Sequence, residues 1–172
     1  MAFKIGDCVV HPAHGVGHVK KIEARKFGRK DAILFYRVVT DKCTVWVPAE
    51  TYETYGLRPI TEKEELRRYR RLLSSEPVPL DQDHRIRHGD LTARLKLGTF
   101  QDVCKVLRDL NAYSWQKQLN EADTAMFQRI YEALCHEWAI AASITTTEAD
   151  QEIKDLLQKS KKKYEHKFNI PD

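Results

Sequence analysis

The sequence predicts an α+β protein, with a β-rich N-terminal third followed by an all-helical remainder. Two observations support this fold class. In the first 60 residues, short runs rich in valine, isoleucine and aromatic residues alternate with turn-forming residues, which is typical of β-strands. From residue 61 onwards, apolar residues recur every three or four positions, which is typical of amphipathic helices. The chain has 172 residues, of which 42% are hydrophobic, and this is enough for one large domain or two small ones.

The N-terminal part contains four segments with strand signals, at residues 8–11, 15–24, 32–39 and 43–48. Gly15 and Gly17 lie where a small barrel needs a tight bend or a bulge, and Pro48 ends the last clear strand. Four or five short strands within about 60 residues predict a small SH3-like or Tudor-like β-barrel. We therefore expect residues 1–60 to form the first domain.

A connecting segment is expected at residues 61–80. Thr61 and Glu64 have the spacing of a capping box, in which two side chains satisfy the free backbone groups at a helix start. Leu66, Tyr69 and Leu73 follow at helical spacing. The stretch SSEPVPLDQD then has two prolines and no periodicity, which indicates a linker.

A helical bundle of three or four helices is expected at residues 81–158. Helix starts are predicted at three pairs with cap spacing, namely Thr99 with Asp102, Asn120 with Asp123, and Thr147 with Asp150. The predicted core positions of these helices are Ile86, Leu91, Leu95, Val103, Val106, Leu107, Leu110, Phe127, Ile130, Leu134, Trp138, Ile153, Leu156 and Leu157. Residues 159–172 are basic and lose the period, so we expect a flexible, solvated tail.

Composition and motifs argue against several classes of protein. No apolar run is long enough to cross a bilayer and no secretion signal precedes the first strand, so we expect a cytoplasmic protein. The four cysteines are far apart and form no CxxC pair, which favours reduced thiols. The chain has no P-loop, GxGxxG, GxSxG or HExxH motif. We therefore expect neither an enzyme nor a bound cofactor.

The opening stretch FKIGDCVVHPAHGVGHV can be interpreted in two ways. It holds Cys8, His11, His14 and His18, which are residue types that bind zinc. The same stretch also has the pattern of a strand, a glycine-rich turn and a second strand. Structural zinc sites usually draw their ligands as two close pairs, and no second pair completes this set. We therefore expect a scaffold without metal, and keep a zinc protein as the alternative.

Two basic stretches could bind nucleic acid. In HRIRHGDLTARLK, Arg85, Arg87, Arg94 and Lys96 face only one acidic residue, and arginines at a helix start can reach successive phosphates. The alternative is a solvated helical face. The second stretch is RRYRR at residues 67–71. Three glutamates precede it at helix-pairing distance, which favours a solvated helix.

Trp46 is a candidate contact residue. It lies in a strand between Val45 and Val47, so it points to the opposite side from both valines. If the valines point into the barrel, the indole points outwards and is available to a partner. The alternative is that the indole packs against the helical domain.

The combined pattern resembles the CarD/CdnL family of bacterial transcription regulators. The motifs that carry the resemblance are FKxGDxVVHPxHGVG near the N-terminus, Glu23 with Arg25, VxVPAE at residues 45–50, and LGTFQDVCKVLRDL in the helical half. The N-terminal motif is shared with the polymerase-interacting module of the transcription–repair coupling factor, but this chain has no helicase motifs.

This resemblance implies a specific function. Members of the family bind the β subunit of RNA polymerase through a Tudor-like domain and touch promoter DNA with a helical domain, at the upstream edge of the melted region. They stabilise the open complex. The polymerase-binding residues implied here are Arg25, Phe27, Trp46 and Pro48.

The resemblance also implies a DNA-binding set, consisting of His84, Arg85, Arg87, Arg94 and Lys96. His84 stands where some members insert a tryptophan wedge into the minor groove. We expect a monomer with no small-molecule ligand. The alternative function is a free SH3-like nucleic-acid-binding module without a polymerase partner.

Overall fold

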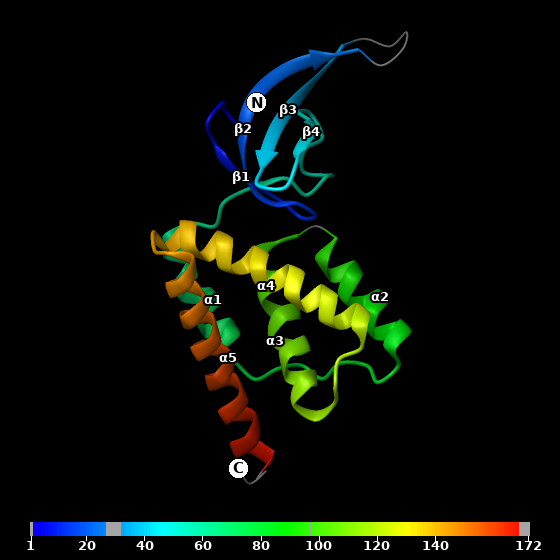
Figure 1. Cartoon of the computed structure of the whole chain (residues 1–172), viewed down its shortest axis with the longest axis vertical. Coiled ribbons are helices and arrows are strands. Elements are labelled where there is room, and N and C mark those ends of the chain that lie inside the picture. Colours follow the sequence, from blue (N-terminus) through cyan, green and yellow to red (C-terminus); the bar gives the residue numbers. More distant parts are fainter. Residues whose placement is uncertain (1, 27–31, 97, 169–172) are drawn as a thin grey trace. The chain divides into compact units, whose positions relative to one another are not determined.

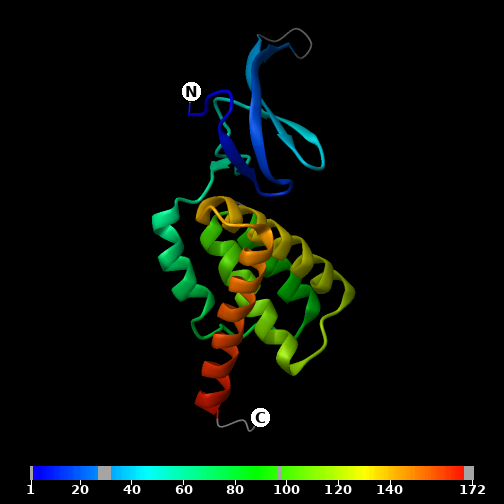
Figure 2. The same ribbon diagram turned by 60° about the vertical axis from the view of Figure 1, so that its left-hand side comes forward.

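The computed structural model describes residues 2–26, 32–96 and 98–168, with only the backbone described at residues 167 and 168. The chain divides into an N-terminal unit, residues 1–60 with 96–98, and a helical unit, residues 61–95 with 99–172. Figures 1 and 2 show strands in the first unit and helices in the second, which confirms the α+β class.

The N-terminal unit is built on one antiparallel sheet of five strands in the order β4-β3-β2-β1-β5. The strands are β1 (Cys8–His11), β2 (Gly15–Arg25), β3 (Ile33–Thr40), β4 (Thr44–Pro48) and β5 (Arg58–Pro59). The first four agree with the predicted segments. The fifth has only two residues, which is too short to leave a strand signal in the sequence.

In the part of the chain that the structure describes, this sheet is open. Strands β4 and β5 form its two edges, and neither is paired to the other. The long strand β2 changes register between Val19 and Lys21, and such a bulge increases the local twist of a sheet. Closure into the predicted barrel is therefore not observed, and the barrel stays a prediction.

One face of the sheet carries the core of the N-terminal unit. The buried residues are Phe3, Val9, Val19, Tyr36, Val38, Val47, Ala49 and Leu57. At its centre, the rings of Phe3 and Tyr36 pack edge to face with their centroids 5.5 Å apart. The predicted roles of two glycines are also visible. Gly15 has φ +75°, and a Cβ atom on Gly17 would lie 2.8 Å from the carbonyl oxygen of Val39.

The helical unit contains five α-helices and one short 3-10 turn among its described residues. They are the turn η1 (Lys63–Glu65) and the helices α1 (Leu66–Leu73), α2 (His84–Leu95), α3 (Phe100–Gln116), α4 (Glu121–Ala142) and α5 (Thr146–Phe168). Most of the predicted apolar positions are buried in one shared core, with Trp138 fully buried and Val103, Leu95 and Phe127 at its margin. Ile86 is the exception, because its side chain is 60% exposed.

Two of the predicted helix starts are confirmed in detail. The hydroxyl of Thr99 accepts a bond from the backbone N–H of Asp102 at 3.1 Å, and the side chain of Asn120 accepts one from the N–H of Asp123 at 2.8 Å. Both side chains satisfy backbone donors that a helix start would otherwise leave free.

Two other predicted starts are wrong. Thr61 caps no helix, because its N–H and hydroxyl both donate to the buried carboxylate of Glu137, at 3.1 and 2.8 Å. The start of α5 is capped by Thr145 with Glu148 rather than by Thr147 with Asp150. At α5 two neighbouring pairs offered the same cap spacing, and the local geometry selects one of them; at Thr61 a distant partner takes the side chain away from the helix start.

The C-terminal segment also differs from the expected flexible tail. Helix α5 continues to Phe168, ten residues beyond the predicted end of the bundle. Ser160 is buried, its hydroxyl donates to the carbonyl of Ser75 at 2.6 Å, and Lys163 donates to the carbonyl of Ser74 at 2.7 Å. These long-range bonds anchor a segment whose sequence shows no apolar period.

Two further findings bear on the expected class of protein. No helix among the described residues is both long enough and apolar enough to span a membrane. None of the four cysteines forms a disulfide; Cys104 and Cys135 are buried, and Cys8 and Cys43 are half-buried.

Candidate functional site

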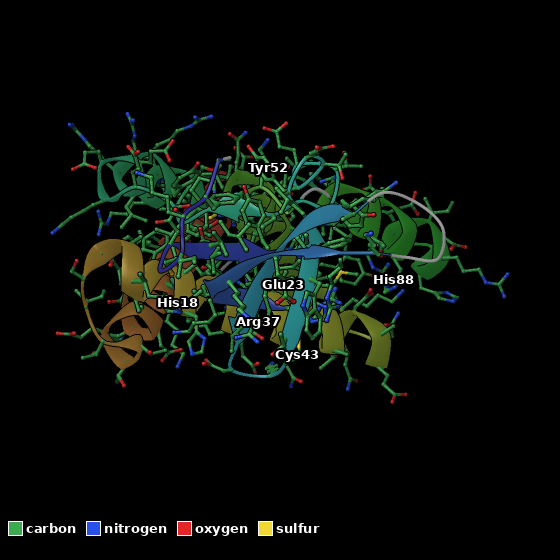
Figure 3. The ribbon with its side chains drawn as sticks, turned by 90° about the horizontal axis from the view of Figure 1, so that it is seen from above. His18, Glu23, Arg37, Cys43, Tyr52 and His88 are labelled. Atoms are coloured by element: carbon green, nitrogen blue, oxygen red, sulfur yellow. The ribbon has the colours of Figure 1, made fainter. Side chains whose placement is uncertain are left out.

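The face of the sheet opposite the core carries the first candidate site. Along β4 the side chains alternate, so Val47 is buried in the core while Trp46, 38% exposed, points outwards. The strand register places Trp46 beside Arg37 of β3. Glu23 and Arg25 of β2 alternate to the same side. We call Glu23, Arg25, Arg37 and Trp46 the outer sheet face. Figure 3 shows Glu23 and Arg37 on the neighbouring strands β2 and β3.

Three of these side chains, Glu23, Arg25 and Trp46, are connected by direct interactions. The indole N–H of Trp46 donates to Oε1 of Glu23 at 2.9 Å. The guanidinium carbon of Arg25 lies 4.3 Å from the centroid of the Trp46 ring, and its Nε lies 3.3 Å from the same carboxylate oxygen. A cation over an aromatic face is an attractive arrangement. The structure therefore brings together Arg25 and Trp46, which the sequence predicted separately.

Glu23 is a charged hub of this cluster. The Trp46 indole bond, together with the charges of Arg25, Lys21 and Arg37, holds the pKa of the Glu23 carboxyl below its usual value. The carboxylate is thus ionised at neutral pH and fixes the orientation of both the indole and the guanidinium. The sequence motif contained Glu23 without assigning it a role. The sequence signal for it is that the charged residues Lys21, Glu23 and Arg25 are spaced two apart on β2 and therefore lie on the same side of the strand.

The other two predicted polymerase-binding residues are Pro48 and Phe27, and Pro48 is not among the interacting side chains of the outer sheet face. Pro48 is half-buried at the end of β4 and is paired with Phe35 in the sheet. Phe27 lies outside the described residues. At the far end of β3, Ile33 and Leu34 are each 41% exposed, and this adds apolar surface to the same strand.

The second candidate site is the N-terminal end of α2. His84 and Arg85 are both exposed in its first turn. The carboxylate of Asp83 accepts bonds from the backbone N–H groups of Arg85 at 2.8 Å and Ile86 at 3.3 Å. These two bonds hold the pKa of Asp83 below its usual value, so the helix start is capped by a charged group. The side chains of His84, Arg85 and Ile86 are presented outwards.

Arg87 does not fit its predicted role as a DNA contact. Its side chain is 3% exposed, and its Nε and Nη2 atoms donate to Oδ2 of the fully buried Asp123 at 2.9 and 2.7 Å. Its Nη1 atom donates to the carbonyl of Asp81 and to the hydroxyl of Tyr113. The guanidinium therefore uses its hydrogen-bond donors on partners inside the helical unit and is not available to DNA. The sequence did not reveal this, because its partners lie on other segments.

The remaining predicted DNA-binding cations, Arg94 and Lys96, have fewer internal partners than Arg87. Arg94 pairs with Asp90 one turn earlier at 2.7 Å and lies 3.8 Å from Asp109. Lys96 is exposed in the segment that groups with the N-terminal unit.

Ile86 was predicted as a core residue, which is wrong. Arg87, four residues before the buried Leu91, occupies the inward position of that turn instead.

The N-terminal Cys and His residues lie around the β1–β2 turn. Nδ1 of His11 accepts a bond from the N–H of Ala13 at 3.2 Å, and the rings of His11 and His14 are 4.7 Å apart. Burial, and then the neighbouring His14, lower the pKa of His11. Nδ1 of His14 lies 3.4 Å from Sγ of Cys43. Within residues 2–26, 32–96 and 98–168, no group of three or more His, Cys, Asp or Glu residues could hold a metal ion.

Comparison with known proteins finds similarity along both units of the chain. The family model described as "CarD, C-terminal domain" matches residues 61–154, and that described as "CarD-like/TRCF RID domain" matches residues 3–69. The Bacillus subtilis (strain 168) protein named "Putative transcription factor YdeB" is 29% identical over 148 residues, which cover 83% of this chain and 94% of that protein.

Proposed function

Because the chain belongs to the CarD family of transcription regulators, we propose that it binds RNA polymerase through the outer sheet face and promoter DNA through the start of α2. The polymerase partner is the β subunit. The DNA target is the upstream edge of the melted region, and the result is a longer-lived open complex.

The observation that carries this proposal is the cluster of Arg25, Trp46 and Glu23. Tryptophan and arginine are the residues most enriched at the energetic centres of protein interfaces. Here the guanidinium is stacked 4.3 Å from the indole, and one carboxylate holds both groups. Side chains that are already ordered lose less conformational entropy on binding. The face therefore combines apolar area, positive charge and order, as a protein-binding surface requires.

The start of α2 is suited to DNA for a different reason. The guanidinium of Arg85 is exposed beside His84 and next to Ile86, which is 60% exposed. Arginine binds phosphates, and an apolar side chain beside it can enter between base steps and unstack them. Histidine fills less volume than the tryptophan found at this position in some family members.

Tethering the two sites to one polymerase explains how weak DNA contacts suffice. Binding of the N-terminal unit to the polymerase raises the effective concentration of the helical unit near the promoter. If α2 binds melted DNA more tightly than closed duplex, the opening equilibrium shifts by that difference in affinity. No covalent chemistry is involved.

Family membership also supports the finer expectations from the sequence. We assign the N-terminal unit to the Tudor-like class and expect the protein to act as a monomer. Binding to the polymerase places it in the bacterial cytoplasm.

The polymerase site is tested by Arg25→Glu in a binding assay with purified β subunit. We expect at least a tenfold loss of affinity, since the substitution removes the stacked cation and places a carboxylate beside Glu23. The matched control is Arg129→Glu, the same charge change at an exposed position on α4. Unchanged binding by Arg25→Glu would show that the outer sheet face is not the polymerase site. A free nucleic-acid-binding module predicts no polymerase binding by any of these proteins.

The DNA site is tested by the lifetime of open complexes formed with His84→Trp and His84→Ala. The larger indole should fill a base step more completely and lengthen the lifetime, whereas alanine should shorten it. Equal lifetimes for wild type and both variants would remove His84 from the DNA contact.

A further inference from the structure

The helices α1 and α5 lie side by side and run in the same direction, as Figures 1 and 2 both show. Arg70 of α1 pairs with Glu152 early in α5. About two turns further along, Lys163 and Ser160 of α5 donate to the carbonyls of Ser74 and Ser75 at the end of α1. These interactions join α5 to the C-terminal half of α1 and to the residues that follow it.

Basic side chains collect along this junction. On α1, Arg67, Arg70 and Arg71 lie on the side that Arg70 presents to α5. On α5, Lys159, Lys162 and Lys163 are spaced at i, i+3 and i+4, so they share the stripe from which Lys163 reaches Ser74. We call these six residues the α1/α5 cationic face.

Most of this charge is not neutralised within the chain. Arg67, Arg71, Lys159 and Lys162 are exposed, and none has an ion-pair partner within 4.0 Å in the described part of the protein. On α5, Glu152 is engaged by Arg70 and Glu165 pairs with Lys161, while Asp155 is exposed four residues before Lys159. Glu62, Glu64 and Glu65 precede Arg67 at the same, N-terminal end of α1 and offset part of its charge.

We propose that the α1/α5 cationic face binds the phosphate backbone of duplex DNA, as a second DNA-binding surface separate from the start of α2. This inference deepens the proposed function and rests on it. It gives the helical unit one site for the melted edge and another for the double helix beyond it. The RRYRR stretch, which the sequence alone favoured as a solvated helix, supplies three of the six cations.

The chemistry of the face favours DNA over a protein partner. None of the exposed large apolar side chains in the described residues lies on α1 or α5. Protein interfaces have a desolvated centre rich in aromatic and apolar groups, as the outer sheet face has in Trp46. Binding to the DNA backbone needs only cations and hydrogen-bond donors, since phosphate neutralisation with release of counterions supplies the affinity. Residues four apart on a helix rise by about 6 Å, so Arg67 with Arg71 and Lys159 with Lys163 form two short rows of charge.

The test compares two double variants of the same helix. Lys159→Gln with Lys162→Gln removes two charges from the cationic face. Lys154→Gln with Lys161→Gln removes two charges from the other side of α5, where both lysines pair with carboxylates one turn away. All four lysines lie outside the core, so both variants should fold, and circular dichroism checks this. The probe is a 40-base-pair duplex of arbitrary sequence, titrated with the full chain between 20 and 200 mM salt.

We expect the Lys159/Lys162 variant to bind the duplex at least fivefold more weakly than wild type at low salt. The slope of log affinity against log salt should become shallower by about 0.9 for each phosphate that the variant no longer neutralises. Adding Arg67→Gln and Arg71→Gln should weaken binding further, whereas the Lys154/Lys161 variant should match wild type.

Three results would overturn the proposal. The first is an equal loss of duplex affinity in the two double variants. The second is that wild type shows no salt-sensitive binding to the duplex. The third is that the Lys159/Lys162 variant loses polymerase binding while its duplex binding is unchanged. The last result would identify the face as a protein-binding surface. These outcomes are distinct from failure of the proposed function, which is measured by Arg25→Glu and by the His84 variants.

Discussion

Replacing Arg87 with alanine tests whether this arginine holds the helical unit together or binds DNA. The structure places its guanidinium 2.7 and 2.9 Å from Oδ2 of Asp123, with side-chain exposures of 3% for Arg87 and 0% for Asp123. Removing one partner of a buried ion pair leaves a charge without compensation and typically costs about 3–5 kcal/mol. The backbone carbonyls of Asp81 and Gln82 would lose their donor as well. A loss of this size lowers the Tm of a domain of about 100 residues by at least about 12 °C.

The assay is thermal and urea unfolding followed by circular dichroism, with duplex DNA binding measured on the same samples at a temperature where each variant is folded. Arg85→Ala, two residues earlier and exposed, is the matched control and should change stability by less than about 0.5 kcal/mol. A double variant with leucine at both Arg87 and Asp123 should recover much of the loss, because it leaves no buried charge. If Arg87→Ala unfolds like wild type and loses DNA binding, our assignment of Arg87 to the interior is refuted and the sequence prediction holds.

Two further predictions concern the N-terminal unit and the helix α2. Gly17→Ala should destabilise the sheet by about 1–3 kcal/mol, since its Cβ would lie 2.8 Å from the carbonyl oxygen of Val39. In Gly89→Ala the added Cβ on α2 meets open space, so the substitution should stabilise the helical unit by about 0.5–1 kcal/mol. Urea unfolding measures both free-energy changes. If both substitutions change the stability in the same direction, the packing described at these glycines is contradicted. For Glu23, the indole bond and the surrounding cations lower the pKa in the folded state below the usual 4.5. The stability that the carboxylate contributes is present above the unfolded-state pKa and is lost as the pH falls through the folded-state pKa. The difference in Tm between wild type and Glu23→Gln should therefore shrink as the pH falls below 4.5, and a difference that grows there would contradict the assignment.

Many elements of the fold could be predicted from local sequence signals. Strand alternation around Trp46 placed its indole on the outer face, and the apolar spacing of Leu66, Tyr69 and Leu73 identified α1. The caps at Thr99 and Asn120 were predicted correctly from a local pattern, since a cap is formed by residues three positions apart, although the same spacing misled at Thr61 and Thr147. These features depend on atoms that are close in sequence, so the pattern carries the information.

The candidate sites were predicted less completely. The sequence selected Arg25 and Trp46, but it did not show that Glu23 of β2 would bond to Trp46 of β4 and so join the two. It grouped Arg85 and Arg87 as equivalent cations, although one is exposed and the other is buried. It also treated Thr61 as a helix cap, although its partner Glu137 is 76 residues away.

The sequence by itself determined the order and type of the elements, the face of each strand and helix that is apolar, and the family to which the chain belongs. Only the tertiary structure decided which basic side chains are exposed and available to bind a partner, and which are neutralised inside the protein. Arg87 is neutralised by a carboxylate on α4, whereas the arginines of α1 and the lysines of α5 are brought onto one surface by bonds between distant segments. The physical reason is that secondary structure follows from the spacing of neighbouring residues, while burial and ion pairing depend on which elements pack together. A basic residue in a sequence is therefore only a candidate for binding until its partners in the fold are known.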